Sequence, residues 1–172
     1  MKRLIVVLFF LSMIVFAEAT QLLIPMDVSQ SNHLKAYGIA YWVLKQDVKV
    51  DWLLNYRGGS FGIPYAAAIE NECKIRGVGY EVIADAQYNS IIAEIADPEK
   101  NMDVMKLEKA PKVAVYSPKN KLPWDDAVTL VLTYAEIPYD VVYDDEVLDG
   151  ALIKYDWLHL HRSEEHTSEL QS

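Results

Sequence analysis

Cysteine is nearly absent from this chain of 172 residues, which contains only Cys73. A single cysteine excludes an intrachain disulfide, so a folded domain must be stabilised by its hydrophobic core rather than by cross-links. Cys73 lies in the helical stretch Asn71-Glu72-Cys73-Lys74, which has no flanking glycine. This context favours a small buried helix residue over a reactive thiol.

Basic residues are also few. The chain has 16 Lys and Arg against 25 Asp and Glu, and its formal net charge is −9 at pH 7. Nucleic acids and anionic membrane surfaces both favour clusters of Lys and Arg. The charge balance therefore argues against a nucleic-acid partner, and it gives no positive indication of a substrate.

A long apolar run occurs at the N-terminus. The basic pair Lys2-Arg3 precedes the apolar stretch 4–16, and Ala17-Glu18-Ala19 fits the cleavage pattern of a secretory signal. A membrane-spanning helix needs about 20 apolar residues, which this run does not reach. We interpret 1–19 as a signal peptide and expect a periplasmic or extracellular protein with no stable membrane span after cleavage, an uncleaved anchor being the alternative.

The other end of the chain has an unusual sequence. Residues 162–172 read RSEEHTSELQS, which is the translation of a common short-read sequencing adapter. Processing scars are set aside before a fold is considered. We therefore interpret 162–172 as an adapter artefact, which predicts a native protein that continues beyond His161.

Between these ends, apolar runs typical of strands alternate with stretches of helical periodicity. Strands are expected over 22–25, 50–56, 80–84, 112–116, 140–143 and 155–161, and helices over 33–46, 65–76, 86–96 and 124–135. Strands that alternate with helices of about 10 to 15 residues predict βαβ units. The expected fold is α/β, with a mostly parallel, flavodoxin-like sheet and helices on both faces.

The domain organisation follows from two proline-containing pairs, Asp97-Pro98 and Ala110-Pro111, which enclose charged residues. Proline-containing pairs around charged residues are typical of a connecting loop rather than of a helix or strand. We expect a first α/β unit over 20–96, a connecting stretch over 97–111 and the start of a second α/β unit over 112–161.

Candidate ligand-binding residues follow from the expected sheet, because open parallel sheets bind ligands at the carboxyl ends of their strands. An Asp in such a position more often caps a helix than acts on a ligand, so the selection is geometric. It identifies no catalytic residue. The candidates are Asp27, Arg57, Asp85, Ser117, Asp144, His159 and His161.

Two of these candidates suggest a metal. His159 and His161 alternate along one expected strand, so both imidazoles face the same side and could meet one metal or one substrate. Two histidines are too few for a closed zinc site, and a solvated polar strand end is the alternative.

A glycine-containing segment suggests an anion site. Arg57-Gly58-Gly59-Ser60 could approach an anion through its backbone N–H groups and its guanidinium, with an ordinary turn as the alternative. It matches neither the P-loop nor the dinucleotide-binding pattern, so the identity of any cofactor stays unknown from the sequence. Among the tryptophans, Trp42 and Trp52 are expected in the core, and Trp124 is the one expected to line a cleft.

The sequence also resembles known families. Residues 112–161, with the strings KVAVYSP, VTLVLTYAEIPY, DVVYDDEV and YDWLHLH, resemble the opening of the class I glutamine amidotransferase-like fold. His159-Leu160-His161 stands where that superfamily carries a glycine-rich oxyanion loop. Over 20–161, the strings LLIPMDVSQSNHLKAYGIAYWVL and VDWLLNYRGGSF resemble an exported bacterial family commonly labelled asparagine synthetase B.

This resemblance implies an exported amidotransferase-like protein that binds or hydrolyses a small polar ligand at the strand carboxyl ends. Two alternatives stay open. One is a non-catalytic binding or scaffold module of the same fold. The other is a glutamine-hydrolysing asparagine synthetase, as the family label implies.

Overall fold

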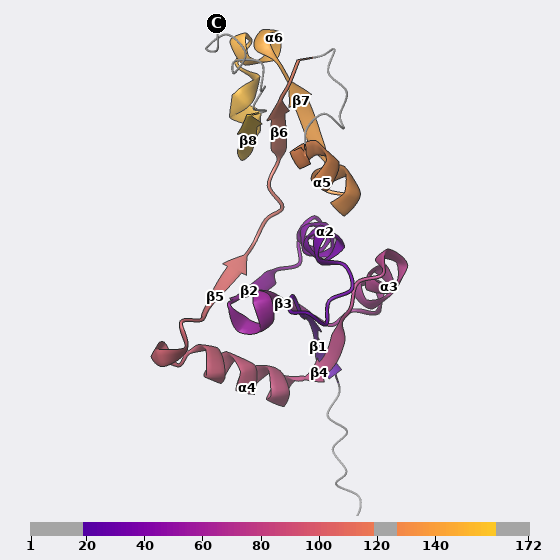
Figure 1. The fold of residues 1–172 in the computed structure, drawn as a ribbon, viewed down its shortest axis with the longest axis vertical. Coiled ribbons are helices and arrows are strands. Elements are labelled where there is room, and N and C mark those ends of the chain that lie inside the picture. The colour runs from indigo at the N-terminus through magenta and orange to yellow at the C-terminus, as the bar shows by residue number, and fades with distance from the viewer. Residues whose placement is uncertain (1–18, 119–126, 161–172) are drawn as a thin grey trace, which may run out of the picture.

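A computed structural model of the chain describes residues 19–118 and 127–160, which form two α/β units joined by one connection. Figure 1 shows the second unit above the first, with the chain crossing between them after β5 (Asp103–Leu107). No helix within the described ranges is long and apolar enough to cross a membrane.

The first unit is built on a five-stranded sheet with the order β4-β1-β3-β2-β5, in which every neighbouring pair is antiparallel. Its further elements, in chain order, are β1 (Ala19–Ile24), α2 (His33–Leu44), β2 (Val50–Leu54), the 3-10 turn η1 (Tyr56–Gly58), β3 (Ser60–Pro64), α3 (Ala67–Arg76), β4 (Glu81–Ala84), α4 (Asp85–Ile95) and the 3-10 turn η2 (Pro98–Lys100).

The topology of this unit is two interleaved βαβ crossovers. β1 and β2 are joined through α2 but have β3 between them, and β3 and β4 are joined through α3 but have β1 between them. This is the split βαβ arrangement of ferredoxin-like folds. β5 extends it as an edge strand beside β2.

The expectation of a mostly parallel, flavodoxin-like sheet is therefore wrong for the main sheet. The sequence patterns did not reveal two strands of this sheet, β3 and β5. Both run antiparallel to their neighbours, and β3 separates β1 from β2, which would otherwise have been expected to pair in parallel. β3 follows the turn at Arg57-Gly58-Gly59-Ser60 and contains Gly62 and Pro64, which are poor strand formers. β5 lies inside 97–111, where its charged residues suggested a connecting stretch.

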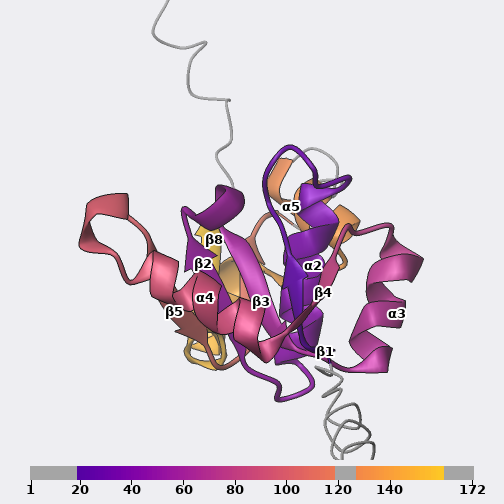
Figure 2. The same ribbon diagram turned by 90° about the horizontal axis from the view of Figure 1, so that it is seen from below.

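The core lies on both faces of this sheet because side chains alternate along each strand. Leu22, Phe61 and Ile63 pack with α2 and α3 on one face, whereas Leu23 and Leu53 pack with α4 on the other. In Figure 1, α2 lies above the sheet and α4 below it, and Figure 2 shows α4 crossing in front of the strands.

Two local features of the helices in the first unit bear on its stability. Asn32 caps α2, its side chain accepting a hydrogen bond from the backbone N–H of Lys35 at 3.1 Å. Cys73 in α3 is fully buried, as expected, and burial raises the pKa of its thiol to about 12. A thiol with so high a pKa stays protonated at neutral pH, which suits a packing role.

The second unit is a three-stranded parallel sheet with β6 between β7 and β8. Its elements are β6 (Val113–Tyr116), α5 (Ala127–Ala135), β7 (Tyr139–Val142), α6 (Asp144–Leu148), the 3-10 turn η4 (Ala151–Lys154) and β8 (Trp157–Leu160). Val113 and Val115 of β6 pack against Leu132 of α5. Within the ranges described, parallel pairing occurs in this small sheet alone.

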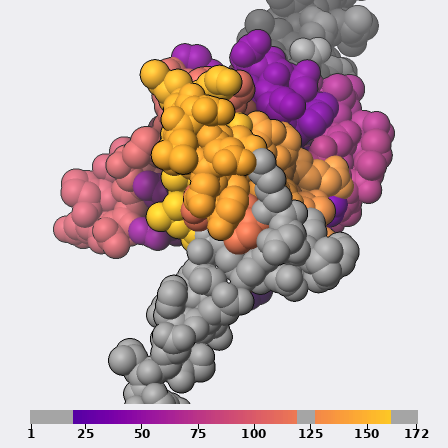
Figure 3. All heavy atoms as spheres, turned by 90° about the horizontal axis from the view of Figure 1, so that it is seen from above, coloured from indigo at the N-terminus to yellow at the C-terminus, as the bar shows by residue number. Residues whose placement is uncertain are grey.

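The two units meet where α5 packs on α2. A Cβ atom built on Gly38 would lie 1.9 Å from the backbone oxygen of Ala135, so only glycine allows this approach. Seen from above in Figure 3, the second unit, in orange and yellow, lies over the middle of the first.

Polar contacts surround this point of approach. Glu136, just after α5, forms an ion pair with Lys35 of α2, and its second oxygen lies 3.3 Å from Nη1 of Arg76 in α3. The side-chain amide of Asn32 donates a hydrogen bond to the hydroxyl of Tyr134 at 2.6 Å. One turn of α5 is thus tied to both helices that cover the upper face of the main sheet.

Candidate ligand-binding cleft

Two of the sequence-predicted residues, Asp27 and Arg57, lie together. Nε of Arg57 donates to Asp27 Oδ2 at 2.7 Å, and Nη1 donates to Glu81 Oε1 at 2.7 Å. Hydrogen bonds from Ser29 and Arg57 lower the pKa of Asp27 to about 2. With two carboxylates on its guanidinium, Arg57 ties three segments of the first unit together.

The glycine turn beside Arg57 serves the same packing. Gly58 has φ +81°, and a Cβ atom there would lie 2.4 Å from the carbonyl oxygen of Met26. The turn therefore presses its backbone against the loop between β1 and α2, where a side chain would not fit. Arg57, Gly58 and Gly59 belong to the connection of the β2–β3 hairpin, and Ser60 begins β3.

Asp85 lies at the opposite end of β1 from Asp27. It is the first residue of α4 and accepts a hydrogen bond from the hydroxyl of Thr20. β1 and β4 are antiparallel, so their carboxyl ends point in opposite directions. The six residues of β1 separate the two carboxylates by roughly 20 Å, which excludes a shared site.

Ser117 and Asp144 share one edge of the small sheet, because its strands are parallel. The backbone N–H of Ser117 donates to Val142 O at 3.1 Å, and the hydroxyl of Tyr116 donates to Asp144. This contact raises the pKa of Tyr116 to about 12. The Tyr116 ring also packs against Tyr143, with centroids 5.3 Å apart.

The predicted histidine pair falls partly outside the described residues, since His161 is not among them. His159 lies in β8, half-buried, with its Cα opposite that of Val115 in β6. Within 19–118 and 127–160, no group of three or more His, Cys, Asp or Glu side chains could hold a metal ion.

A cleft of about 720 Å³ lies between the two units and is lined by side chains of both. Small-molecule sites commonly have volumes of about 300–1,000 Å³. The lining is mostly aromatic and aliphatic. It comprises Tyr37, Ala40, Tyr41 and Leu44 of α2, Trp52 and Phe61 of the main sheet, Lys106, Leu107, Glu108, Lys109 and Pro111 at the crossing, and Val113, Leu132, Ile137 and Trp157 of the second unit.

The floor of the cleft arises from the register of the main sheet. Its residues Phe61 and Trp52 belong to a cross-strand row on one face that begins at Ile24 and ends at Met105, neither of which lines the cleft. Exposure rises along this row from 0% at Ile24 through 2% at Phe61 to 49% at Met105. The helices thus cover the β1 side of the face and leave its β2 and β5 margin open.

The small sheet of the second unit, which lies opposite this floor, is also only partly covered by a helix. On the small sheet, α5 covers β6, but Trp157 of β8, on the same sheet face as Val113, is 49% exposed. The uncovered margin of one sheet therefore faces the uncovered margin of the other, and the cleft is the space between them.

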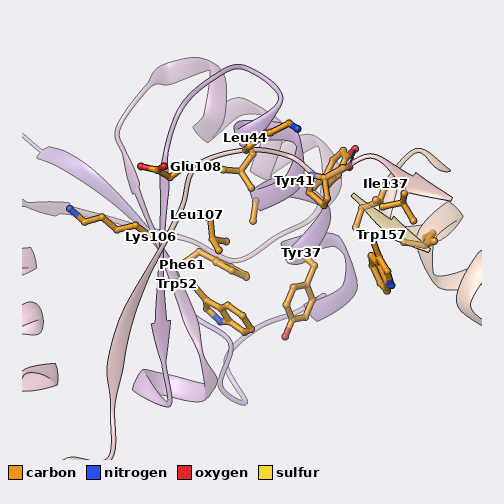
Figure 4. Close-up of a pocket in the computed structure, with 15 residues that line it drawn as sticks. Tyr37, Tyr41, Leu44, Trp52, Phe61, Lys106, Leu107, Glu108, Ile137 and Trp157 are labelled. Carbon is orange, nitrogen blue, oxygen red and sulfur yellow. Dashed lines mark hydrogen bonds between the residues drawn. The ribbon is translucent and has the colours of Figure 1, made fainter. Parts of the chain in front are cut away.

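The aromatic lining has defined geometry (Figure 4). The rings of Trp52 and Phe61 are stacked with centroids 6.2 Å apart and an interplanar angle of 29°. The ring of Tyr37 meets Phe61 edge-on at 5.6 Å. Nε1 of Trp52 donates to Gly59 O at 3.0 Å, and the hydroxyl of Tyr41 donates to Pro111 O at 3.0 Å. Because these two polar groups are already hydrogen-bonded within the protein, the surface that the rings present to a ligand is mostly apolar.

Two of the three charged residues of the lining, Glu108 and Lys109, are paired with their neighbours, and the side chain of Lys106 extends away from the aromatic residues (Figure 4). Glu108 forms an ion pair with Lys49, which lowers the pKa of Glu108, and Lys109 lies 3.3 Å from Asp156. A ligand in the cleft would therefore meet little uncompensated charge.

The sequence interpretation selected none of these aromatic residues as ligand contacts. Trp52, expected in the core, packs partly on it and also lines the cleft. Trp124, expected to line a cleft, lies outside the described residues. The alternating pattern of β2 marks Trp52 as a residue of one sheet face, but no local signal shows that a second unit lies opposite.

Comparisons of the chain with protein-family models, with curated proteins and with solved structures found no match. The chemistry of the cleft is therefore the basis on which a function is inferred.

Proposed function

We propose that this protein binds a small, largely apolar molecule in the cleft between its two units. The observation that carries the proposal is the aromatic and aliphatic lining of a space of about 720 Å³. Burial of apolar ligand surface contributes roughly 25 cal/mol for each Å² removed from water. Paired charges at the rim, such as Lys49 with Glu108, favour a ligand of low charge.

This proposal develops the non-catalytic alternative suggested by the sequence, a binding module, but moves the site. The strand ends at which a polar ligand was expected are occupied by internal contacts, as between Asp27 and Arg57 and between Tyr116 and Asp144. The hydrolytic and glutamine-dependent activities implied by the family resemblance stay predictions, as does export of the protein.

A dye titration tests the proposal. Nile red is planar, uncharged and fluorescent in apolar surroundings, so saturable enhancement with a single site is expected. Leu107→Glu places a carboxylate in the apolar wall and is expected to weaken dye binding at least about tenfold, because a charge pays a desolvation cost in such surroundings.

Met105→Glu is the matched control. Met105 lies on the same face of β5 but is 49% exposed and does not line the cleft. This variant is expected to bind the dye like the unchanged protein. Equal binding by both variants would place the dye elsewhere and contradict the proposal.

A further inference from the structure

We infer that the molecule bound in this cleft is a planar aromatic compound with a polar substituent, which stacks on Trp52 and reaches the hydroxyl of Tyr37. The inference rests on the proposed binding function and names its ligand class. Three features of the lining support it: a fixed indole, a second aromatic wall and a hydroxyl that makes no hydrogen bond within the described part of the chain.

The indole of Trp52 is held in one orientation before any ligand arrives. Its Nε1 donates to the carbonyl oxygen of Gly59, and its ring stacks with Phe61. A Cβ atom on Gly59, which has φ +93°, would lie 3.3 Å from that Nε1, so the turn fits closely around the indole edge. A surface fixed in this way costs little entropy to bind against, and a flat partner uses it best.

The facing wall is also aromatic. Trp157, from the second unit, lines the same cleft, and in the view of Figure 4 it lies across from Trp52, with Tyr37 between them. Aromatic rings prefer offset-stacked or edge-to-face contact with other aromatic rings, and gain energy from it beyond the area they bury. A planar aromatic ligand can gain this energy from the aromatic lining, whereas a saturated ring system gains mainly from the area that it buries.

The hydroxyl of Tyr37 supplies a polar contact. Across the described residues this hydroxyl makes no hydrogen bond, whereas the Trp52 N–H and the Tyr41 hydroxyl are both used within the protein. The Tyr37 side chain is 43% exposed and its ring is positioned by Phe61. A hydroxyl can donate and accept, so it can pair with a hydroxyl, carbonyl or amine on the ligand.

Paired probes test the ligand class by calorimetric titration of the full chain. Naphthol and decahydronaphthol share a carbon skeleton and a hydroxyl, but only naphthol is planar and aromatic. We expect naphthol to bind about two- to tenfold more tightly, the range that aromatic pairs contribute. Equal or tighter binding of decahydronaphthol, still lost in Leu107→Glu, would overturn the inference while leaving the proposed function standing. If neither probe binds, the proposed function fails with it.

Variants separate the two contacts. Trp52→Leu is expected to abolish the preference for naphthol, and Trp52→Phe, which keeps an aromatic face, to retain most of it. Tyr37→Phe is expected to weaken naphthol about two- to tenfold, the range for one hydrogen bond, and to leave naphthalene unchanged.

Trp42→Phe is the control, because Trp42 packs on the core of the first unit and does not line the cleft. This variant is expected to bind both probes normally. Equal losses of naphthol and naphthalene in Tyr37→Phe would show that the hydroxyl has no role and contradict that part of the inference.

Discussion

The two units of this protein differ in how completely their sheets are covered. The first has helices on both faces of a five-stranded sheet, with separate hydrophobic clusters above and below it. The second has three strands, and its hydrophobic cluster, counted over the described residues, contains the buried side chains of Val113, Val115 and Leu132. So small a core gives a unit little stability of its own. We infer that the second unit depends on its contact with α2.

This difference teaches where a binding site can arise. A sheet whose faces are fully covered leaves no apolar surface for a ligand. A partly covered sheet leaves apolar surface that another part of the protein or a ligand can cover. Here part of the uncovered surface is closed by the contact of α5 with α2, and the remainder forms the aromatic cleft. Stability and binding are therefore linked, since both depend on the second unit staying in place.

The largest expected effect is in the core of the first unit. Ile63 is fully buried, and Ile63→Ala is expected to cost about 2–5 kcal/mol of unfolding free energy. Leu132→Ala, in the second unit, is expected to lower the denaturant concentration at which that unit unfolds. The unfolding transition of the first unit is expected to stay nearly unchanged. Denaturant unfolding followed by hydrogen exchange measures both. Equal loss of protection in both units for both variants would contradict the comparison.

The next effect is at the contact between the units. Gly38→Ala improves helix propensity in α2 by about 1 kcal/mol, but its methyl group would lie 1.9 Å from Ala135 O. We expect the second unit to lose hydrogen-exchange protection while the first retains its own.

Gly77→Ala is the control for that change. Gly77 has φ +67° and nothing near its missing Cβ, so alanine there strains the end of α3 without reaching α5. If Gly77→Ala also lowered hydrogen-exchange protection in the second unit alone, the effect of Gly38→Ala could not be assigned to the close packing of Gly38 against α5.

A smaller effect is expected from the ion pairs at the contact. Glu136→Gln removes the pairs with Lys35 and Arg76 and is expected to cost about 1 kcal/mol or less, because Glu136 is half-exposed. These pairs lower the pKa of Glu136, so their contribution is present above the ordinary carboxyl pKa and is lost as pH falls through the lowered value. Glu94→Gln, which affects a pair with Lys100 remote from α5, is the control, and hydrogen exchange in the second unit is the readout.

The smallest expected effect concerns the first unit alone. Hydrogen bonds from Ser29 and Arg57 lower the pKa of Asp27 from 3.8 to about 2, so the stabilisation from these contacts is present above pH 3.8 and is lost as pH falls towards 2. Asp27→Asn is expected to remove this part of the acid dependence and to leave the docking of the second unit unchanged. Unfolding curves at several pH values test it. An unchanged acid profile in the variant would contradict the assignment.

The sequence allowed the helices to be predicted better than the sheet. Helical periodicity placed helices over 33–46 and 86–96, close to the observed α2 and α4. The strands β3 and β5 were missed because glycine and proline in one and charges in the other masked their patterns. These two strands take part in three of the four neighbouring pairs of the main sheet.

The cleft could not be predicted from local patterns. Trp52 and Trp157 are far apart in the chain and belong to different sheets, and what joins them is the packing of α5 on α2. By contrast, the approach of Ser117 to Asp144 could be anticipated, because those residues follow parallel strands. The rule that places ligands at strand ends holds only where the strands run the same way.

One measurement tests the central claim directly. In a ¹H–¹⁵N spectrum of the full chain titrated with naphthol, the indole N–H signals of Trp52 and Trp157 are predicted to shift together and saturate at one concentration, while that of Trp42 stays in place. Shifts at Trp42 without Trp52 and Trp157, or shifts confined to the Tyr116 and Asp144 edge, would contradict a binding cleft between the two units.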